Sequence, residues 1–230
     1  MIWRSFTGLA LILPAPAFAQ AYQCSLPQRI EPLRPAKPDG PTRHAAIGGF
    51  TLAASWSPEF CRNDRTSMQC SGAHGRFGFV LHGLWPEAAK GPPPQWCSLH
   101  PRPLPELIRR NLCITPAPWL LEHEWAKHGS CMAKKPETYY RVSAILWRSL
   151  NWPDADRLSR REVLTLGDLR RAFVLANPDW KPQMVGVELS RNGWLREIRL
   201  CYSRRFRPQT CPRDRLGPPD STRLKIWRGL

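Results

Sequence analysis

The chain has 230 residues, with 34 Lys and Arg against 18 Asp and Glu, and a formal net charge of +16. Hydrophobic residues make up 42% of it and aromatic residues 10%, which is more than a disordered polybasic protein contains. This length accommodates one domain with a sizeable core. The positive charge indicates a polyanionic partner such as nucleic acid, anionic lipid or an acidic glycan.

Residues 1–19 have the organisation of a secretory signal peptide. Arg4 supplies the positive start, a short apolar stretch interrupted by two prolines follows, and Ala17-Phe18-Ala19 fits a small-x-small cleavage site. No later apolar run reaches the ~18–20 residues that span a bilayer, so we expect no stable membrane insertion. The sequence therefore predicts an exported protein, periplasmic or extracellular, whose formal charge falls by one when Arg4 is removed.

All eight cysteines follow the predicted cleavage site. An even number of cysteines in an exported chain indicates disulfides, four if all of them pair. Cys61 and Cys70, and likewise Cys201 and Cys211, are close enough in sequence to close a local loop. No C-x-x-C pair occurs, so neither a zinc ribbon nor a thioredoxin-type site is indicated.

The first half of the chain alternates irregular and extended segments. Five prolines in residues 27–42 predict an extended arm. Residues 50–56 have strand composition with one apolar face, and residues 57–75 form a polar loop. Residues 76–81 predict a second strand, which we expect to end at the Gly and Pro of His82-Gly83-Leu84-Trp85-Pro86.

The second half contains the predicted helices. A Pro-rich loop at residues 88–103 precedes them. Thr165 is a suitable N-cap for the last helix, which Asn177-Pro178 terminates. The sequence from Val185 to Leu200 reads as a hairpin around Asn192-Gly193, the strongest short turn signal. The four helices are expected at 105–112, 119–128, 137–150 and 166–176. Strands and helices mix without regular alternation, which favours the α+β class.

Two segments concentrate chemistry-bearing side chains, His82 to Glu87 and Glu122 to Cys131. On a helix, Glu124 and His128 are neighbours at i,i+4, and so are His123 and Lys127. One region then presents two imidazoles, a carboxylate and an ammonium. The alternative is a solvated charged helix face, which is the commoner meaning of such runs. The apolar surroundings argue against it: Trp119, Leu120, Leu121 and Trp125.

The second segment also suggests zinc, because zincins place two His in H-E-x-x-H, one helical turn apart. Here His123 and His128 are five positions apart, and Lys127 occupies the position that a ligand needs. An ammonium there would repel the cation, so a zinc hydrolase is the weaker hypothesis. We therefore predict no metal site.

His82-Gly-Leu-Trp-Pro86 followed by Glu122-His-Glu-Trp-Ala-Lys-His-Gly-Ser-Cys131 resembles the two active-site segments of the ribonuclease T2 family. The segments are long, in the family's order and about 40 residues apart. The resemblance also covers Ser55 to Cys61 and Ile198 to Pro212, and thus extends over residues 46–212. It implies an α+β fold with a central antiparallel sheet packed with helices, and a secreted, metal-independent acid ribonuclease without a cofactor.

The resemblance assigns His128 as general base and His82 as general acid, an order that the spacing alone leaves open. RNA supplies its own nucleophile, the 2′-OH, so two imidazoles of opposite protonation state suffice. The resemblance implies that Lys127, with Glu124 beside it, stabilises the developing negative charge and that His123 binds a phosphate oxygen. It implies a 2′,3′-cyclic phosphate product that water opens to a 3′-phosphate.

For the RNA bases, the resemblance places Trp85 and Glu87 in the first base site. Stacking on the Trp85 ring and packing of that ring in the core both stay open. Glu87 is one methylene longer than the Asp common in the family, which changes its reach to a base. Leu120 stands where an aromatic residue often holds the second base, and Trp119 beside it is the candidate substitute.

The family pattern further implies the disulfides Cys61–Cys70, Cys97–Cys131 and Cys201–Cys211, which leaves Cys24 with Cys113. The expected organisation is a signal peptide (1–19), a Pro-rich arm (20–45), a catalytic domain (46–212) and a basic C-terminal tail (213–230). The expected partner is an RNA substrate, and the protein is expected to be a monomer. The alternative function is a catalytically inactive basic protein that binds RNA or a membrane surface.

Overall fold

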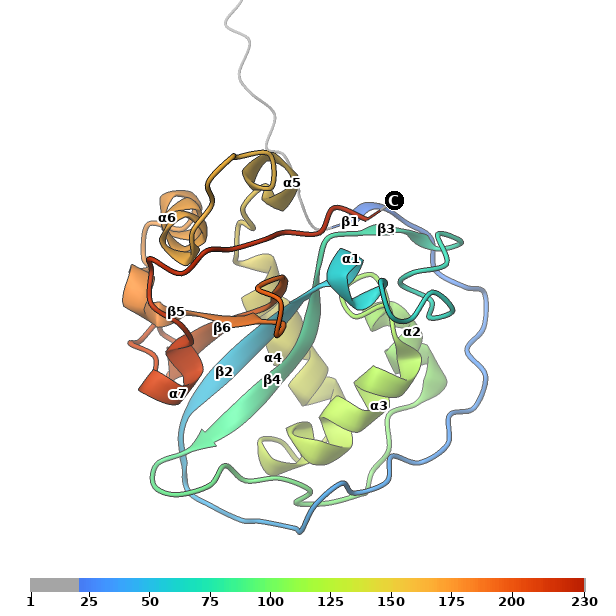
Figure 1. Cartoon of the computed structure of the whole chain (residues 1–230). Helices are drawn as coiled ribbons and strands as arrows, with labels where there is room; N and C mark the ends of the chain where they lie inside the picture. The colour runs from blue at the N-terminus through green and yellow to red at the C-terminus, as the bar shows by residue number, and fades with distance from the viewer. Residues whose placement is uncertain (1–20, 230) are drawn as a thin grey trace, which may run out of the picture.

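The computed structural model describes residues 21–229, so the predicted signal peptide lies outside the described residues. Its centre is a four-stranded antiparallel sheet in the order β4-β2-β6-β5 (Figure 1). The strands are β2 (Ile47–Trp56), β4 (Phe79–Ala88), β5 (Val185–Leu189) and β6 (Leu195–Ser203). A separate pair joins β1 (Ala21–Cys24) to β3 (Gly75–Phe77).

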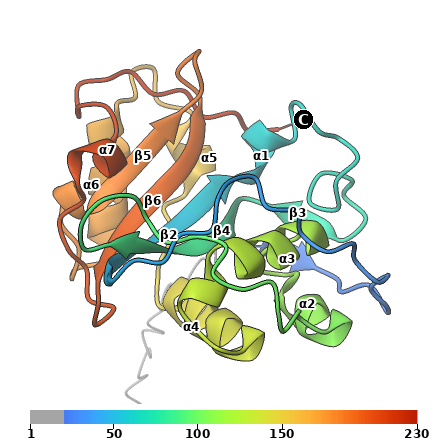
Figure 2. The ribbon, with the colours of Figure 1, turned by 90° about the horizontal axis from the view of Figure 1, so that it is seen from below.

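Helices α2, α3 and α4 gather beside β2 and β4, while α6 lies beside β5 and β6 (Figure 2). With the antiparallel sheet, this arrangement confirms the predicted α+β class. The longer helices are α2 (Pro105–Asn111), α3 (Pro118–Lys127), α4 (Pro136–Arg148) and α6 (Leu166–Ala176). The short ones are α1 (Ser57–Phe60), α5 (Ala155–Leu158), α7 (Arg213–Leu216), η1 (Gly129–Cys131) and η2 (Pro182–Met184).

The two faces of β2 meet different surroundings. Alternate side chains from Phe50 to Trp56 are buried in the hydrophobic core. There the core contains a run of aromatic contacts, in which Phe79 packs on Trp152 and Trp152 on Phe173 of α6. The opposite face of β2 carries Thr51 and Ser55, so this is the polar face of the sheet.

One prediction about β4 is wrong. The strand does not end at the Gly and Pro of the first segment but continues to Ala88. Pro86 is tolerated because β4 lies at the edge of the four-stranded sheet, where its missing N–H interrupts no second ladder. The single strand predicted at residues 76–81 also corresponds to parts of two strands, β3 and β4, which belong to different sheets. The short elements that were not predicted are β1, α1, α5, α7, η1 and η2.

A β-bulge in β4 falls at His82. Ala53 of β2 pairs with Gly83 and Ala54 pairs with Leu81, so His82 is the extra residue between them. Without the bulge, strict alternation would place His82 and Trp85 on opposite faces, since three positions separate them. With the bulge, both lie on the polar face, and their rings meet edge to face at 5.2 Å between centroids.

The four expected disulfides are all present: Cys24–Cys113, Cys61–Cys70, Cys97–Cys131 and Cys201–Cys211. None of the helices within residues 21–229 is long and apolar enough to cross a bilayer.

Both predicted flanking segments contact the body of the protein. The arm runs past α2 and α3, where Arg102 and Arg109 donate to the Leu33 and Pro27 carbonyls (Figure 1). At the other end, Leu224 and Ile226 are buried in the core. The division into domains at residues 45 and 212 stays a prediction.

Candidate active site

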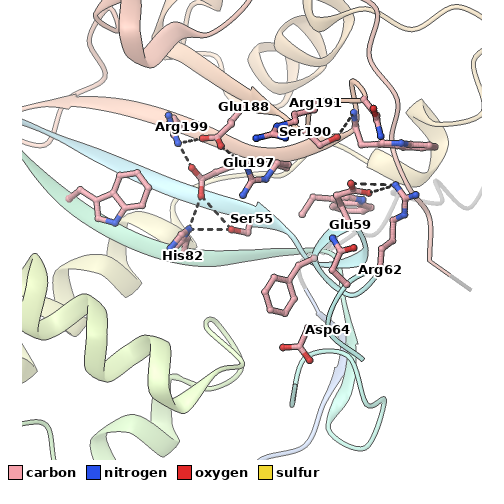
Figure 3. A pocket seen from close by; sticks show the side chains of 17 residues that line it. Ser55, Glu59, Arg62, Asp64, His82, Glu188, Ser190, Arg191, Glu197 and Arg199 are labelled. Atoms are coloured by element: carbon pink, nitrogen blue, oxygen red, sulfur yellow. Dashed lines mark hydrogen bonds and ion pairs between the residues drawn. The ribbon is translucent and has the colours of Figure 1, made fainter. Parts of the chain in front are cut away.

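His82 is held at Nδ1 on the polar face of the sheet. Glu197 of β6 lies with Oε2 2.7 Å from His82 Nδ1, and Ser55 Oγ lies 3.4 Å from the same nitrogen (Figure 3). On the other side of the ring, Nε2 lies 3.6 Å from Glu124 Oε1. The ring therefore joins β4 and β6 to α3. Its side chain is 34% exposed, which leaves it open to a substrate.

Glu124 is buried between α3 and β4. Its Oε2 accepts a hydrogen bond from Trp85 Nε1 at 2.7 Å. Gly83 permits this approach, because a Cβ at that position would overlap Glu124 Oε2 and lie 2.7 Å from Glu124 Cδ. Burial raises the pKa of Glu124 to about 7, against the lowering effects of His82 and the Trp85 hydrogen bond. Glu124 therefore changes charge near neutral pH.

His128 follows the last residue of α3 and lies against the Trp85 ring, with 5.6 Å between ring centroids. Its Nδ1 is buried and has no hydrogen-bond partner within the described chain. Burial, followed by the charge of Lys127, lowers the pKa of His128 to about 3. The next residue, Gly129, packs against Trp125, since a Cβ at that position would lie 2.6 Å from the Trp125 ring. At a given pH, His128 is therefore more readily neutral and His82 more readily protonated.

Lys127 makes an ion pair that the sequence did not predict. Its Nζ lies 2.7 Å from Oδ2 of Asp39, a residue of the Pro-rich arm. Trp96 Nε1 donates to the other Asp39 oxygen at 3.0 Å. The hydrogen bond from Lys127 lowers the pKa of Asp39 against a raising effect of burial, so this carboxylate stays ionised.

His123 lies one helical turn before Lys127 and packs edge to face on Trp96, with 5.3 Å between ring centroids. Burial lowers the pKa of His123, and the Lys127 charge lowers it further. Trp119 precedes His123 by one turn and its side chain is 58% exposed. An exposed indole therefore stands beside the polar cluster.

Trp85 is at the centre of the cluster. Besides its contacts with the two imidazoles and Glu124, its ring lies 5.7 Å from the Arg199 guanidinium carbon. The predicted catalytic side chains His82, Glu124 and His128 are therefore brought together around one indole. The role of Trp85 in base stacking stays a prediction.

Glu87 is engaged by the C-terminal segment. Arg215 Nε lies 2.9 Å from one carboxylate oxygen and Nη2 lies 3.2 Å from the other. Thr51 Oγ1 donates to Glu87 at 2.7 Å. A base that used this carboxylate would share it with Arg215, so the base-binding role of Glu87 stays a prediction.

A groove of about 670 Å³ lies on the polar face of the sheet next to His82 (Figure 3). Its lining includes His82 and Trp85 of the cluster together with Arg62, Arg191 and Trp194. Within residues 21–229, no group of three or more His, Cys, Asp or Glu side chains has an arrangement that could hold a metal ion.

Three residues of the site escaped the sequence analysis: Glu197, Asp39 and Arg215. Each meets its partner from a distant part of the chain, so no local spacing indicates it. In the structure Glu197 pairs with Ser55, so both side chains lie on the same face of the sheet. The alternation of residues along β6 indicates which of them share a face. It does not indicate a partnership with His82.

Comparison with known proteins gives a consistent result. Residues 47–159 match the model of the Ribonuclease T2 family. The chain is 32% identical over 187 residues to a "Probable ribonuclease" of Haemophilus influenzae, covering 75% of this chain and 64% of that protein. It is 31% identical over 163 residues to a "Ribonuclease" of Aeromonas hydrophila, covering 67% and 71% respectively. The chain thus spans just under two thirds of the Haemophilus relative.

Solved structures show a similar fold. RNase NT in complex with 5′-AMP aligns with a TM-score of 0.63 over 78% of this chain and 98% of its own, at 19% identity. Trichomaglin, described as an S-like ribonuclease, also gives 0.63, at 20% identity, over 78% and 97%.

Proposed function

Because the chain belongs to the ribonuclease T2 family, we propose that it is an exported endoribonuclease that cleaves single-stranded RNA by transesterification. The observation that carries the proposal is the pair of imidazoles around Trp85. The pKa of His82 is raised while that of His128 is lowered to about 3. One ring therefore suits a proton donor and the other a proton acceptor.

In the first step His128 takes the proton of the 2′-OH, and the 2′-oxygen forms a bond to the adjacent phosphorus. The bond from phosphorus to the 5′-oxygen breaks, and His82 gives its proton to that oxygen. The products are a 2′,3′-cyclic phosphate and a free 5′-OH. Water then opens the ring to a 3′-phosphate with the two imidazoles in reversed roles. DNA lacks the 2′-OH, so it binds without being cut.

Cations and the buried carboxylate support the transition state in this mechanism. The phosphorus centre gains negative charge, which Lys127 stabilises once a substrate phosphate replaces Asp39 on its ammonium. His123 binds a nonbridging phosphate oxygen. Glu124, whose pKa lies near 7, accepts or shares a proton beside His82 Nε2.

For the bases, we propose that Trp85 stacks on the first base, with Glu87 as its hydrogen-bonding partner. The exposed Trp119 is the candidate platform for the second base, since base stacking on an aromatic ring contributes about 1–3 kcal/mol. The complex of the structural relative RNase NT with 5′-AMP supports a nucleotide site on this fold.

We further propose that the mature protein acts in the periplasm or outside the cell, as a monomer and without a metal or cofactor. The predicted signal peptide and the four disulfides support an oxidising compartment.

The test is incubation of the purified protein with a defined RNA and with the DNA of the same sequence, both in EDTA. We expect cleavage of the RNA alone, with 2′,3′-cyclic phosphate ends that convert to 3′-phosphates. Salt-sensitive RNA binding without cyclic products would instead support the inactive binding protein. Cleavage abolished by EDTA and restored by zinc would support the metal hydrolase.

A further inference from the structure

Glu197 is a buried carboxylate on β6, outside both active-site segments. Its side chain is 7% exposed, and both of its oxygens are occupied. Oε2 faces His82 Nδ1 at 2.7 Å and Ser55 Oγ at 3.4 Å, and Oε1 accepts a hydrogen bond from Arg199 Nε at 2.8 Å (Figure 3). Three contacts therefore fix the carboxylate plane, and the carboxylate in turn fixes one edge of the imidazole.

This contact determines which nitrogen of His82 carries a proton in the neutral ring. An ionised carboxylate accepts hydrogen bonds and donates none, so Nδ1 must be the donor. The other nitrogen, Nε2, then faces the open side of the site, 3.6 Å from Glu124 Oε1. Nε2 is the atom that exchanges its proton with the substrate.

We propose that Glu197 is the positioning residue for His82, which fixes its Nδ1–H tautomer and ring orientation and favours its charged form. The inference rests on the proposed function, since it explains how the general acid stays protonated. A neutral ring with the opposite tautomer would present a protonated Nε2 but would leave two acceptors facing each other at Nδ1.

The charges around His82 agree with this role. Burial alone would lower the pKa of His82, but its hydrogen bond to Glu197 and the charges of Glu124 and Glu197 raise it overall. Arg199 acts in the opposite direction from β6. From α3 and the residue after it, His123 and His128 also interact electrostatically with His82. Burial lowers the pKa of both rings, which favours their neutral forms.

The sign of the effect follows from the role of the ring. A general acid works only when protonated, so activity is lost as the pH rises through its pKa. Removal of the Glu197 charge lowers that pKa, and the alkaline limb of the pH profile moves to lower pH. A charge at hydrogen-bond distance shifts a pKa by about 1–3 units.

The decisive variant is Glu197→Gln, with the pH profile of kcat/KM on a dinucleotide and the NMR titration of the His82 ring as readouts. We expect both the alkaline limb and the ring pKa to fall by about one unit or more, and kcat to fall more than KM changes. The matched control is Glu122→Gln, which removes the charge of an equally buried carboxylate paired with Arg102. It is expected to leave both values in place.

The wild-type protein gives a separate test that needs no variant. In the neutral His82 ring, nitrogen chemical shifts are expected to show the proton on Nδ1; a proton on Nε2 overturns the proposal. An unchanged limb and ring pKa in Glu197→Gln overturn it as well. If the wild type leaves RNA intact, the proposed function fails, while the titration and the tautomer still decide whether Glu197 positions His82.

Discussion

Asp39 of the N-terminal arm and Lys127 of α3 are joined by an ion pair of 2.7 Å across 88 positions of sequence. In the proposed mechanism, Lys127 stabilises the negative charge of the reacting phosphate. Asp39 therefore occupies a position that a substrate phosphate must share or take over.

Replacement of Asp39 by Asn is expected to lower KM for RNA about two- to fivefold at low salt, because an exposed ion pair contributes about 0.2–1 kcal/mol. Steady-state kinetics check this, with Asp179→Asn as the control for loss of one exposed negative charge. A fall in kcat with no change in KM would contradict competition and would mean that Asp39 orients Lys127.

His82→Ala and His128→Ala are each expected to reduce kcat by about 100-fold or more, since each removes one proton-transfer group. The control is His44→Ala, which changes an exposed histidine of the arm region. Matched melting temperatures would show that the variants are folded. A loss of less than about tenfold in either active-site variant would refute the assigned roles.

The pH profile of kcat/KM is expected to be bell-shaped and broad. His128 must be neutral to accept a proton, and its pKa of about 3 keeps it so in acid. His82 must be protonated to donate, and its raised pKa extends activity above the ordinary histidine range. In Lys127→Gln the acid limb should move to higher pH, because the ammonium is one of the causes that lower the pKa of His128. An acid limb that stays in place would contradict this coupling.

Gly83→Ala is expected to destabilise the protein by about 1–3 kcal/mol and to reduce activity, because the added methyl overlaps the Glu124 carboxylate and the Trp85 nitrogen. Urea unfolding and RNA cleavage measure the two effects. Gly40→Ala is the control, since its methyl meets only the flexible end of Gln95. Equal stability of the two variants would show that Glu124 moves aside without cost.

Thr165→Ala is expected to cost about 1 kcal/mol of stability while kcat/KM stays unchanged. Thr165 and Asp168 form a capping box at the start of α6, with both reciprocal hydrogen bonds present. Urea unfolding should show the loss, and Thr165→Ser, which keeps the hydroxyl, should show little of it. An equal loss in both variants would point to the Thr methyl group instead.

The features that the sequence predicted well are local. Thr165 predicts the start of a helix and Asn192-Gly193 predicts a turn, because each signal depends only on residues close by in the sequence. The strand that contains Pro86 was predicted too short because its end depends on the position of β4 at the sheet edge, which is a tertiary property.

In the candidate site, too, contacts between distant parts of the chain could not be predicted from the sequence. The two active-site segments are readable because each is continuous, but the groups that hold them come from elsewhere. Glu197 is 115 positions from His82, and Arg215 is 128 positions from Glu87. Their identities are ordinary for a strand and a basic segment, so only the folded chain reveals their partners.

The bulge at His82 also has a consequence for comparing sequences within the family. If one residue were deleted between Leu81 and Gly83, His82 and the bulge would be lost, while β4 would still pair with β2 and Trp85 and Glu87 would stay on the polar face. Every side chain named for catalysis except the deleted one would still be present in such a sequence. An alignment gap at this position is therefore a sign of a lost activity that an inventory of catalytic residues elsewhere in the chain would miss.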